Sequence, residues 1–323
     1  MTSPDASAPH ITAGQTHAAS VATRAVPRAR GHASGPWSVR HPAGRGPWHP
    51  RRLAGTVVTY LVLIAAAVVT LGPFVLSVMT AFKTPAQFAR ESPLAPPSPW
   101  STVNLEDLLG GRGQFGTAIL VTLAATAVIG AGQLVFSVMA AYAFARIRFF
   151  GRSALFWVYL AGLMVPGIVL VVPLYLMMVQ VGLRNTFWGL VLPFMFASPY
   201  AIFLLREYFR GIPQDLVDAA RIDGAGHWRI LVGIVVPLSR PILATLALIT
   251  VVTQWNSFLW PLVITTGADW RVITVATASL QSQYTGNWTL VMAATTLALV
   301  PLLILFLVFQ RHIVRSITIT GFR

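Results

Sequence analysis

The stretch that decides the fold is Asp218-Ala219-Ala220-Arg221-Ile222-Asp223-Gly224, a short polar sequence that lies between two long apolar segments. Pro213 suits the first turn of a helix, and Asp215 places negative charge near the positive end of the helix dipole. Gly224 suits the end of that helix. The sequence therefore predicts a helix of about three turns from about Pro213 to Arg221.

The residues around this stretch are strongly apolar. The chain of 323 residues is 55% hydrophobic and 10% charged, with a mean hydropathy of +0.70, whereas a soluble domain is about 25% charged. A hydrocarbon core of about 30 Å is crossed by roughly 20 apolar residues in a helix. Six segments are long enough: about 54–79, 116–144, 153–179, 186–205, 239–263 and 288–309. Because backbone groups in lipid must be satisfied internally, we expect an all-α membrane protein with six transmembrane helices.

The basic residues are divided unequally between the two ends of these spans. The segments before the first span, after the second, after the fourth and after the sixth hold 18 of the 23 lysines and arginines. Such residues stay on the cytoplasmic side, so both termini and the loop 206–238 are expected to be cytoplasmic. The net charge of +14 is scattered over four segments. It does not form one groove for phosphates, and we expect no nucleic-acid partner.

The first fifty residues differ from the rest of the chain. Residues 1–52 are rich in Ala, Ser, Pro, Gly, Thr, His and Arg and have no apolar periodicity. Such a composition cannot offset the entropy of ordering, so we expect a disordered, Arg-rich cytoplasmic tail. The apolar stretch that begins near Leu53 is too long for a secretory signal and is expected to remain as the first membrane helix. Residues 53–323 are then a single transmembrane domain.

Several kinds of catalytic site are excluded by the residue inventory. The chain has no cysteine, so it has no disulfide and no Cys-ligated metal. A phosphate-binding loop needs Gly-Lys-Ser/Thr, but the only lysine, Lys83, follows Phe82. No glutamate follows a histidine, so a His-Glu-x-x-His zinc helix is absent. We therefore expect no catalytic residue, no metal and no cofactor of its own, and an intramembrane enzyme is disfavoured.

The acidic residues also disfavour a self-sufficient carrier. Ion-coupled carriers and proton pumps usually keep a carboxylate or histidine within a span. All nine acidic residues here lie in the predicted loops or at helix ends. A self-sufficient secondary solute carrier or channel remains the alternative, since Na⁺ can be bound by carbonyl groups alone.

The predicted helix after Pro213 has two distinct faces. Leu216 and the pair Ala219/Ala220 fall on one stripe together with Ile212, while Asp218 and Arg221 can pair on another face. Small alanines would let the surface of another protein approach closely. Gly224 permits a sharp reversal into a second helix near His227 or Trp228. The alternative is an amphipathic helix that merely lies on lipid headgroups.

The same residues resemble a known family motif. Asp218-Ala219-Ala220, three residues, Gly224, nine residues, Ile234 and then Val236-Pro237 are similar to the Glu-Ala-Ala loop of ABC importer permeases. The longer pattern from Ile212 to Ala225 resembles the carbohydrate-uptake branch. Asp218 and Val236 stand where Glu and Leu are usual, and both keep the charge or the apolar character. The ending Thr318–Arg323 differs from the family's Gly/Ala-rich ending, so a contact between the C-terminus and the ATPase is not carried over.

Other stretches support this resemblance over most of residues 53–323. They are Ala140–Arg146, Val172–Tyr175, Gly182–Thr186 and Trp255–Leu262. The resemblance implies the type I ABC importer permease fold in a bacterial cell membrane, with a cytoplasmic coupling helix. It also implies four kinds of partner besides membrane lipid: a cytoplasmic ATPase dimer that binds the ATP, a second homologous permease, an extracytoplasmic solute-binding protein and the sugar. The residues that would contact the ATPase are Leu216, Asp218, Ala219, Ala220, Asp223 and Gly224.

The substrate pathway is expected in the fifth span. Gln254, Trp255, Asn256 and Phe258 combine amide groups with aromatic rings, which suits sugars with hydroxyls and apolar ring faces. The alternative is that Gln254 and Asn256 only hydrogen-bond neighbouring helices, a contact that contributes about 0.6 to 2 kcal/mol in membranes. The predicted function is a permease subunit for a sugar or oligosaccharide, with a polyol or another small polar solute as the alternative substrate.

Overall fold

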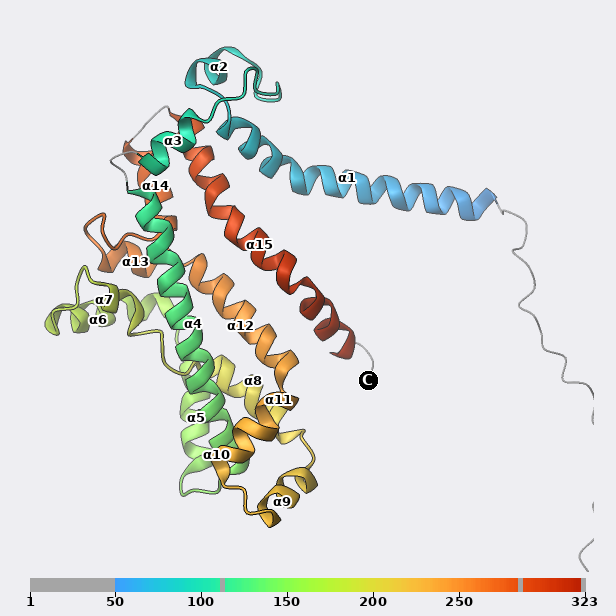
Figure 1. Ribbon diagram of the computed structural model, residues 1–323, viewed down its shortest axis with the longest axis vertical. Helices are drawn as coiled ribbons and strands as arrows, with labels where there is room; N and C mark the ends of the chain where they lie inside the picture. The colour runs from blue at the N-terminus through green and yellow to red at the C-terminus, as the bar shows by residue number, and fades with distance from the viewer. Residues whose placement is uncertain (1–49, 111–113, 284–286, 321–323) are drawn as a thin grey trace, which may run out of the picture. The chain divides into compact units, whose positions relative to one another are not determined.

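The computed structural model describes residues 50–110, 114–283 and 287–320, and the side chains within 55–110, 114–281 and 287–309 (Figure 1). The chain divides into two compact units, residues 1–59 and 60–323. Of the first unit, only the start of the helix α1 is described. The predicted disordered tail therefore lies almost wholly outside the described residues.

Every regular element in the described residues is helical, as the all-α prediction requires. The first half of the chain forms α1 (Pro50–Ala81), α2 (Pro85–Arg90), α3 (Val103–Gly110), α4 (Phe115–Arg146), α5 (Arg152–Gly162), α6 (Gly167–Gln180), α7 (Phe187–Val191) and α8 (Pro199–Arg210). The second half forms α9 (Gln214–Ile222), α10 (His227–Ile230), the π-helix η1 (Leu231–Val235), α11 (Val236–Leu238), α12 (Arg240–Trp255), α13 (Leu259–Ile264), α14 (Ile273–Gln283) and α15 (Trp288–Thr320).

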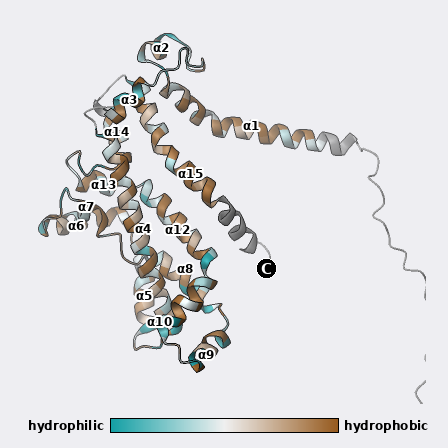
Figure 2. Ribbon diagram, in the orientation of Figure 1, coloured by the Kyte–Doolittle hydropathy of each residue, from teal (hydrophilic) through white to brown (hydrophobic). Residues whose placement is uncertain are grey.

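Three of the described helices are each long and apolar enough to cross a membrane. They are Gly55–Ala81 within α1, all of α4, and Trp288–Phe309 within α15. Figure 2 shows hydrophobic residues along most of their described lengths. These helices agree closely with the predicted spans 54–79, 116–144 and 288–309.

The third, fourth and fifth predicted spans are each divided into two helices. The axes of α5 and α6 differ by 99° across the break at 163–166. Residues 192–198 separate α7 from α8, and residues 256–258 separate α12 from α13. Pro166 and Pro199 stand at the starts of α6 and α8, where the missing N–H and the restricted preceding residue keep each new helix from extending towards the earlier one.

The described residues therefore hold three candidate membrane helices, or up to five if each bent pair counts as one span. The two bent pairs are α5 with α6, and residues His227–Leu238 with α12.

The helix α4 supports the irregular segment between α7 and α8. A Cβ at Gly132 would lie only 2.4 Å from the carbonyl oxygen of Met195, so the absence of a side chain allows this close approach. Gln133 Nε2 donates to the carbonyl of Phe194 at 2.8 Å, and Ser137 Oγ accepts from the N–H of Ser198 at 3.1 Å. These contacts satisfy backbone groups that no helix satisfies, as a segment in an apolar bundle requires.

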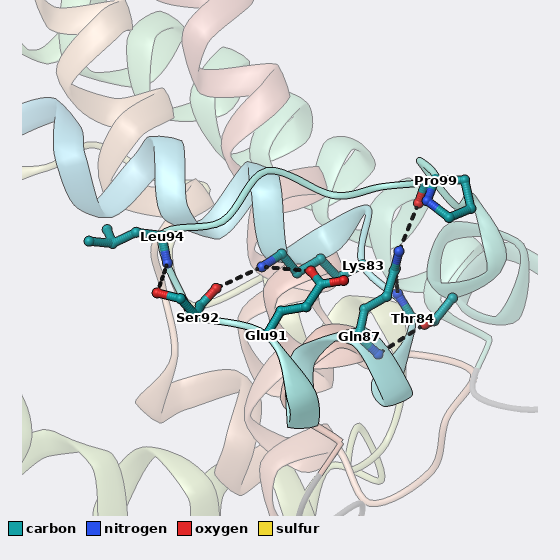
Figure 3. A network of polar contacts seen from close by, with 7 residues as sticks. All are labelled: Lys83, Thr84, Gln87, Glu91, Ser92, Leu94 and Pro99. Atoms are coloured by element: carbon teal, nitrogen blue, oxygen red, sulfur yellow. Dashed lines mark hydrogen bonds and ion pairs between the residues drawn. The ribbon is translucent and has the colours of Figure 1, made fainter.

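The only lysine of the chain fixes the loop between α1 and α3 (Figure 3). Lys83 is fully buried, and its Nζ donates to the carbonyl of Ser92 at 3.1 Å and lies 3.7 Å from a carboxylate oxygen of Glu91. Thr84 and Gln87 form a capping box at the start of α2, and Gln87 Nε2 also donates to the carbonyl of Pro99 at 3.2 Å. The loop is thus folded onto itself by several polar contacts.

Candidate functional site

The predicted helix after Pro213 is α9, and its bounds agree with the prediction to within one residue. Pro213 is the N-cap residue with φ −52°, and Asp215 lies in the first turn. Gly224 has φ +77°, in the left-handed region that favours glycine. The N–H of Ala225 donates to the carbonyl of Ala220 at 2.9 Å, which closes the end of α9. The chain then reverses into α10, which begins at His227 as expected.

One face of α9 packs on the chain itself, and the other face is exposed. Val217 is fully buried in a cluster that also contains Ile212, and Ala220 packs against this cluster. Leu216 is 46% exposed and Ile222 is 87% exposed. The predicted stripe is therefore wrong for Ile212 and Ala220, which contact the chain's own core. Leu216 remains on the free surface, as do Asp218, Ala219, Asp223 and Gly224.

Val217 anchors α9, although the sequence pattern alone does not single it out. A signal was present, because Val217 and Ala220 are three residues apart and so share a helix face. Because valines are frequent in this chain, a single valine in a polar stretch is a weaker indication of a buried contact than the alanine pair.

A second anchor of α9 comes from the last residue of α4. The guanidinium of Arg146 donates to the carbonyls of Phe209 and Ile212 and to Oε1 of Gln214. The carbonyls at the end of α8 have no partner within that helix, so an arginine at this position satisfies them. Arg146 thus holds α8, the connecting turn and the first residue of α9 together.

The predicted pair between Asp218 and Arg221 is confirmed. Arg221 Nη1 lies 3.2 Å from Asp218 Oδ1, which also accepts from Gln214 Nε2 at 2.9 Å. Both charged side chains are about half exposed, so the pair contributes at most about 1 kcal/mol to stability. Its main effect is to fix the direction of the carboxylate on the exposed face of α9.

The chain bends again soon after α10. The helical stretch His227–Leu238, which includes the π-helix η1, meets α12 at 81°. The bend lies at Ser239, whose side chain is buried. Tyr208 donates to the carbonyl of Leu238 at 3.2 Å, and Tyr142 shares a hydrogen bond of 3.3 Å with His227 Nδ1. These contacts connect the segment after α9 to α4 and α8.

The four residues expected on the substrate pathway have different environments. Gln254 lines a cavity of about 20 Å³ together with Thr122, Thr126 and Ser257 and with apolar residues such as Leu190, Phe194 and Trp260. This volume holds about one water molecule. Trp255 is only 4% exposed, and its Nε1 donates to the carbonyl of Ala298 in α15 at 3.1 Å.

Asn256 and Phe258 lie outside this cavity. Asn256 Nδ2 donates to the carbonyl of Val252 in its own helix at 2.8 Å, and Phe258 is 40% exposed. The structure therefore brings Gln254 to this small cavity, but it does not gather the four residues around one site.

Comparison with known proteins identifies the family. A model of the family described as "Binding-protein-dependent transport system inner membrane component" matches residues 133–319. The diacetylchitobiose uptake system permease protein NgcG of Streptomyces coelicolor is 33% identical over 84% of this chain and 90% of its own length. The lactose transport system permease protein LacG of Rhizobium radiobacter is 33% identical over 82% of this chain and 96% of its own length.

A solved structure has the same fold. It is a chain of a bacterial ABC transporter involved in the import of the acidic polysaccharide alginate, with a TM-score of 0.71 at 22% identity. The match covers 82% of this chain and 98% of the transporter chain. The family match includes α8 to α12 with the anchored α9, and the two relatives extend the similarity over most of the chain. The chain belongs to the binding-protein-dependent transport system inner membrane components, the permease subunits of ABC importers.

Proposed function

We propose that this chain is the transmembrane permease subunit of an ATP-driven importer for a sugar or oligosaccharide. The geometry of α9 supports this proposal most strongly. This helix has one exposed face, and its other face is rigidly attached to the helices of the membrane bundle. The relatives support the substrate class, because their names refer to diacetylchitobiose, lactose and arabinooligosaccharides. Another relative, 37% identical over 63% of this chain, is named as a permease for sn-glycerol-3-phosphate. A small polyol derivative is therefore the second candidate substrate.

The coupling mechanism follows from the two anchors of α9. A separate ATPase dimer contacts the exposed residues of α9 and of the turn that follows it, which are Leu216, Asp218, Ala219, Asp223 and Gly224. Val217 and Arg146 pass its movement to α4 and α8, because both residues join α9 to these helices. The permease then alternates between inward-open and outward-open states, and ATP binding and hydrolysis on the partner shift the populations.

The proposal includes a definite membrane topology. The chain crosses the membrane of the bacterial cell six times, with α9 and both termini in the cytoplasm. The bent pair α5 and α6 is one crossing, and the segment from α7 to α8 is the next. The distribution of 18 basic residues on one side and 5 on the other supports this orientation.

The working transporter also contains a second permease and an extracytoplasmic solute-binding protein. The large exposed apolar surfaces of α1, α5 and α6 are available to lipid and to the second permease. A solved neighbour is described in complex with a periplasmic protein bound to an alginate pentasaccharide, with a TM-score of 0.58 at 19% identity. On this basis the outer loops of this chain face such a binding protein.

Gln254 is the residue that we place on the substrate pathway. The cavity that Gln254, Thr122, Thr126 and Ser257 line together with apolar residues is too small for a sugar ring. In this conformation the pathway is closed at that point, and a sugar passes only when α4 and α12 separate. Trp255 has a packing role, because its hydrogen bond to Ala298 joins two helices, whereas Asn256 is exposed and bonds only to Val252 in its own helix.

Reconstitution in vesicles tests the function. The chain is combined with the second permease, the ATPase pair and the binding protein encoded beside it, and uptake of the sugar that this binding protein retains is measured. Accumulation that requires ATP inside the vesicles and every subunit supports the proposal. Accumulation by this chain alone, driven by an ion gradient, would show a secondary carrier instead.

A further inference from the structure

A second polar feature lies beside α9, and the transport function does not account for it. A cavity of about 810 Å³ opens between the end of α4, the residues that follow it, the start of α5, α9 and α10. Its lining residues are Ala145, Arg146, Ile147, Arg148, Arg152, Gln214, Asp218, Arg221 and His227. Four arginines and a histidine thus face the same space as a single carboxylate.

The carboxylate of Asp218 does not balance this charge. Its Oδ1 already accepts from Gln214 and Arg221. Arg152 Nη1 donates to the carbonyl of Ile147 at 3.1 Å, which leaves most of its five N–H donors for other acceptors. The Nε of Arg146 is buried and has no acceptor among the described residues. The cavity therefore holds more cationic donors than acceptors.

The surroundings of the cavity suggest where an acceptor comes from. The cavity lies between the last residue of α4 and the first turn of α5, at the ends of two helices of the apolar bundle. Phe149 and Phe150 lie in the connecting segment, and Phe150 is fully exposed. An exposed aromatic ring beside arginines is typical of the boundary between lipid tails and headgroups. Arg148 and Arg152 also line a smaller cavity of about 360 Å³ at the start of α5.

We propose that this cavity binds a phosphate group, with Arg148 and Arg152 on one wall and Arg221 and His227 on the other. Guanidinium groups bind phosphate with two parallel hydrogen bonds, and the volume accepts a headgroup or a small phosphorylated compound. The phosphate belongs either to an anionic lipid of the adjacent leaflet or to a soluble anion. Because one wall belongs to α9, a bound phosphate connects α9 to the segment between α4 and α5 and stabilises its position.

The experiment uses the purified full-length chain in a neutral detergent. Native mass spectrometry measures the binding of phosphatidylglycerol against phosphatidylcholine, and calorimetry measures the binding of inorganic phosphate. The test variant is Arg148→Gln with Arg152→Gln. The matched control is Arg229→Gln with Arg240→Gln, two exposed arginines outside the cavity. Arg221→Gln alters an exposed residue on the opposite wall and provides the test if the first variant does not fold.

The wild-type chain is expected to retain phosphatidylglycerol or inorganic phosphate. The Arg148/Arg152 variant weakens that binding about tenfold, as the loss of a charge-assisted hydrogen bond implies, and Arg221→Gln weakens it severalfold. The control pair binds like the wild type. Selective retention of the lipid assigns the site to a headgroup, and retention of inorganic phosphate assigns it to a soluble anion. The proposal is overturned if neither is retained, or if the control pair loses as much binding as the cavity variants.

Discussion

At the scale of single residues, Gly224 has the most specific conformational role. It turns the chain after α9 with φ +77°, and among the described residues nothing but its own chain neighbours lies within 4 Å of the place that a Cβ would occupy. A side chain at this position is disfavoured by the left-handed backbone conformation and not by a steric clash with other residues. Holding a residue other than glycine in this conformation costs roughly 1–2 kcal/mol, and more for a β-branched residue. We predict that Gly224→Val nearly abolishes sugar uptake while the level of protein in the membrane stays normal.

Two other glycine variants isolate the conformational effect. Gly226 has φ −72° and equally open surroundings, so Gly226→Val should leave most uptake intact. Gly224→Asn should also retain uptake, because asparagine tolerates the left-handed region. Uptake is measured in cells that lack the native permease and is normalised to protein in the membrane fraction. Normal uptake by Gly224→Val would contradict the role of this turn in coupling.

Asn104 has a structural role of comparable specificity. It is 2% exposed, and its Nδ2 donates at 2.8 Å to the carbonyls of both Ala81 and Lys83. Its Oδ1 accepts from Thr289 Oγ1 at 3.0 Å. We predict that Asn104→Ala lowers the free energy of unfolding by about 2–4 kcal/mol, because it leaves buried carbonyls without donors. Thermal unfolding in detergent tests this, with the exposed Asn256→Ala as a control that changes stability little.

At the scale of elements, the decisive contact joins α4 to the start of α9. Arg146 bonds the carbonyls of Phe209 and Ile212 and the side chain of Gln214 at the same time. A lysine keeps the charge but presents one ammonium group, which cannot replace this planar array of donors. We predict that Arg146→Lys raises hydrogen exchange in residues 213–222 about tenfold and reduces uptake. Arg210→Lys, at an exposed arginine of α8, is the control; unchanged exchange in α9 would exclude the anchoring role of Arg146.

The sequence predicted α9 well because its signals are local. Pro213, Asp215 and Gly224 act within the helix itself, so neighbouring residues suffice to place its ends. The contact of Arg146 was not predictable in this way, because its partners lie more than sixty residues further along the chain. The same limit applies to Trp255, whose hydrogen bond to the carbonyl of Ala298 depends on how α12 meets α15.

Hydropathy also failed to predict where the membrane helices break. The residues around Pro166 and those at 192–198 are as apolar as the helices beside them, so a window of 20 residues averages over the break. The separation of α7 from α8 depends on contacts with α4. In α4, the absence of a side chain at Gly132 leaves room for the irregular segment, and the side chains of Gln133 and Ser137 hydrogen-bond its backbone. A break of this kind is stable only in the folded bundle.

At the scale of the whole molecule, the number of membrane crossings depends on whether each pair of broken helices spans the membrane once. Length and composition give three to five spans in the described residues. The asymmetry of basic residues predicts loops that alternate between the two sides, and in this prediction α5 with α6 crosses once and α7 with α8 crosses back. A re-entrant α5–α6 pair would instead return the chain to the side from which it came.

Because the chain contains no cysteine, single-cysteine variants can settle the topology directly. Five exposed positions follow one another along the chain: Ser92, Ser153, Arg184, Asp223 and Asp269. Each position is changed to cysteine in turn. A membrane-impermeant maleimide should label the variants at Ser92, Arg184 and Asp269 in intact spheroplasts. The variants at Ser153 and Asp223 should react only after the membrane is opened. Labelling of Arg184→Cys on the same side as Ser153→Cys would show that α5 and α6 are re-entrant, and the six-span topology with a cytoplasmic α9 would then be wrong.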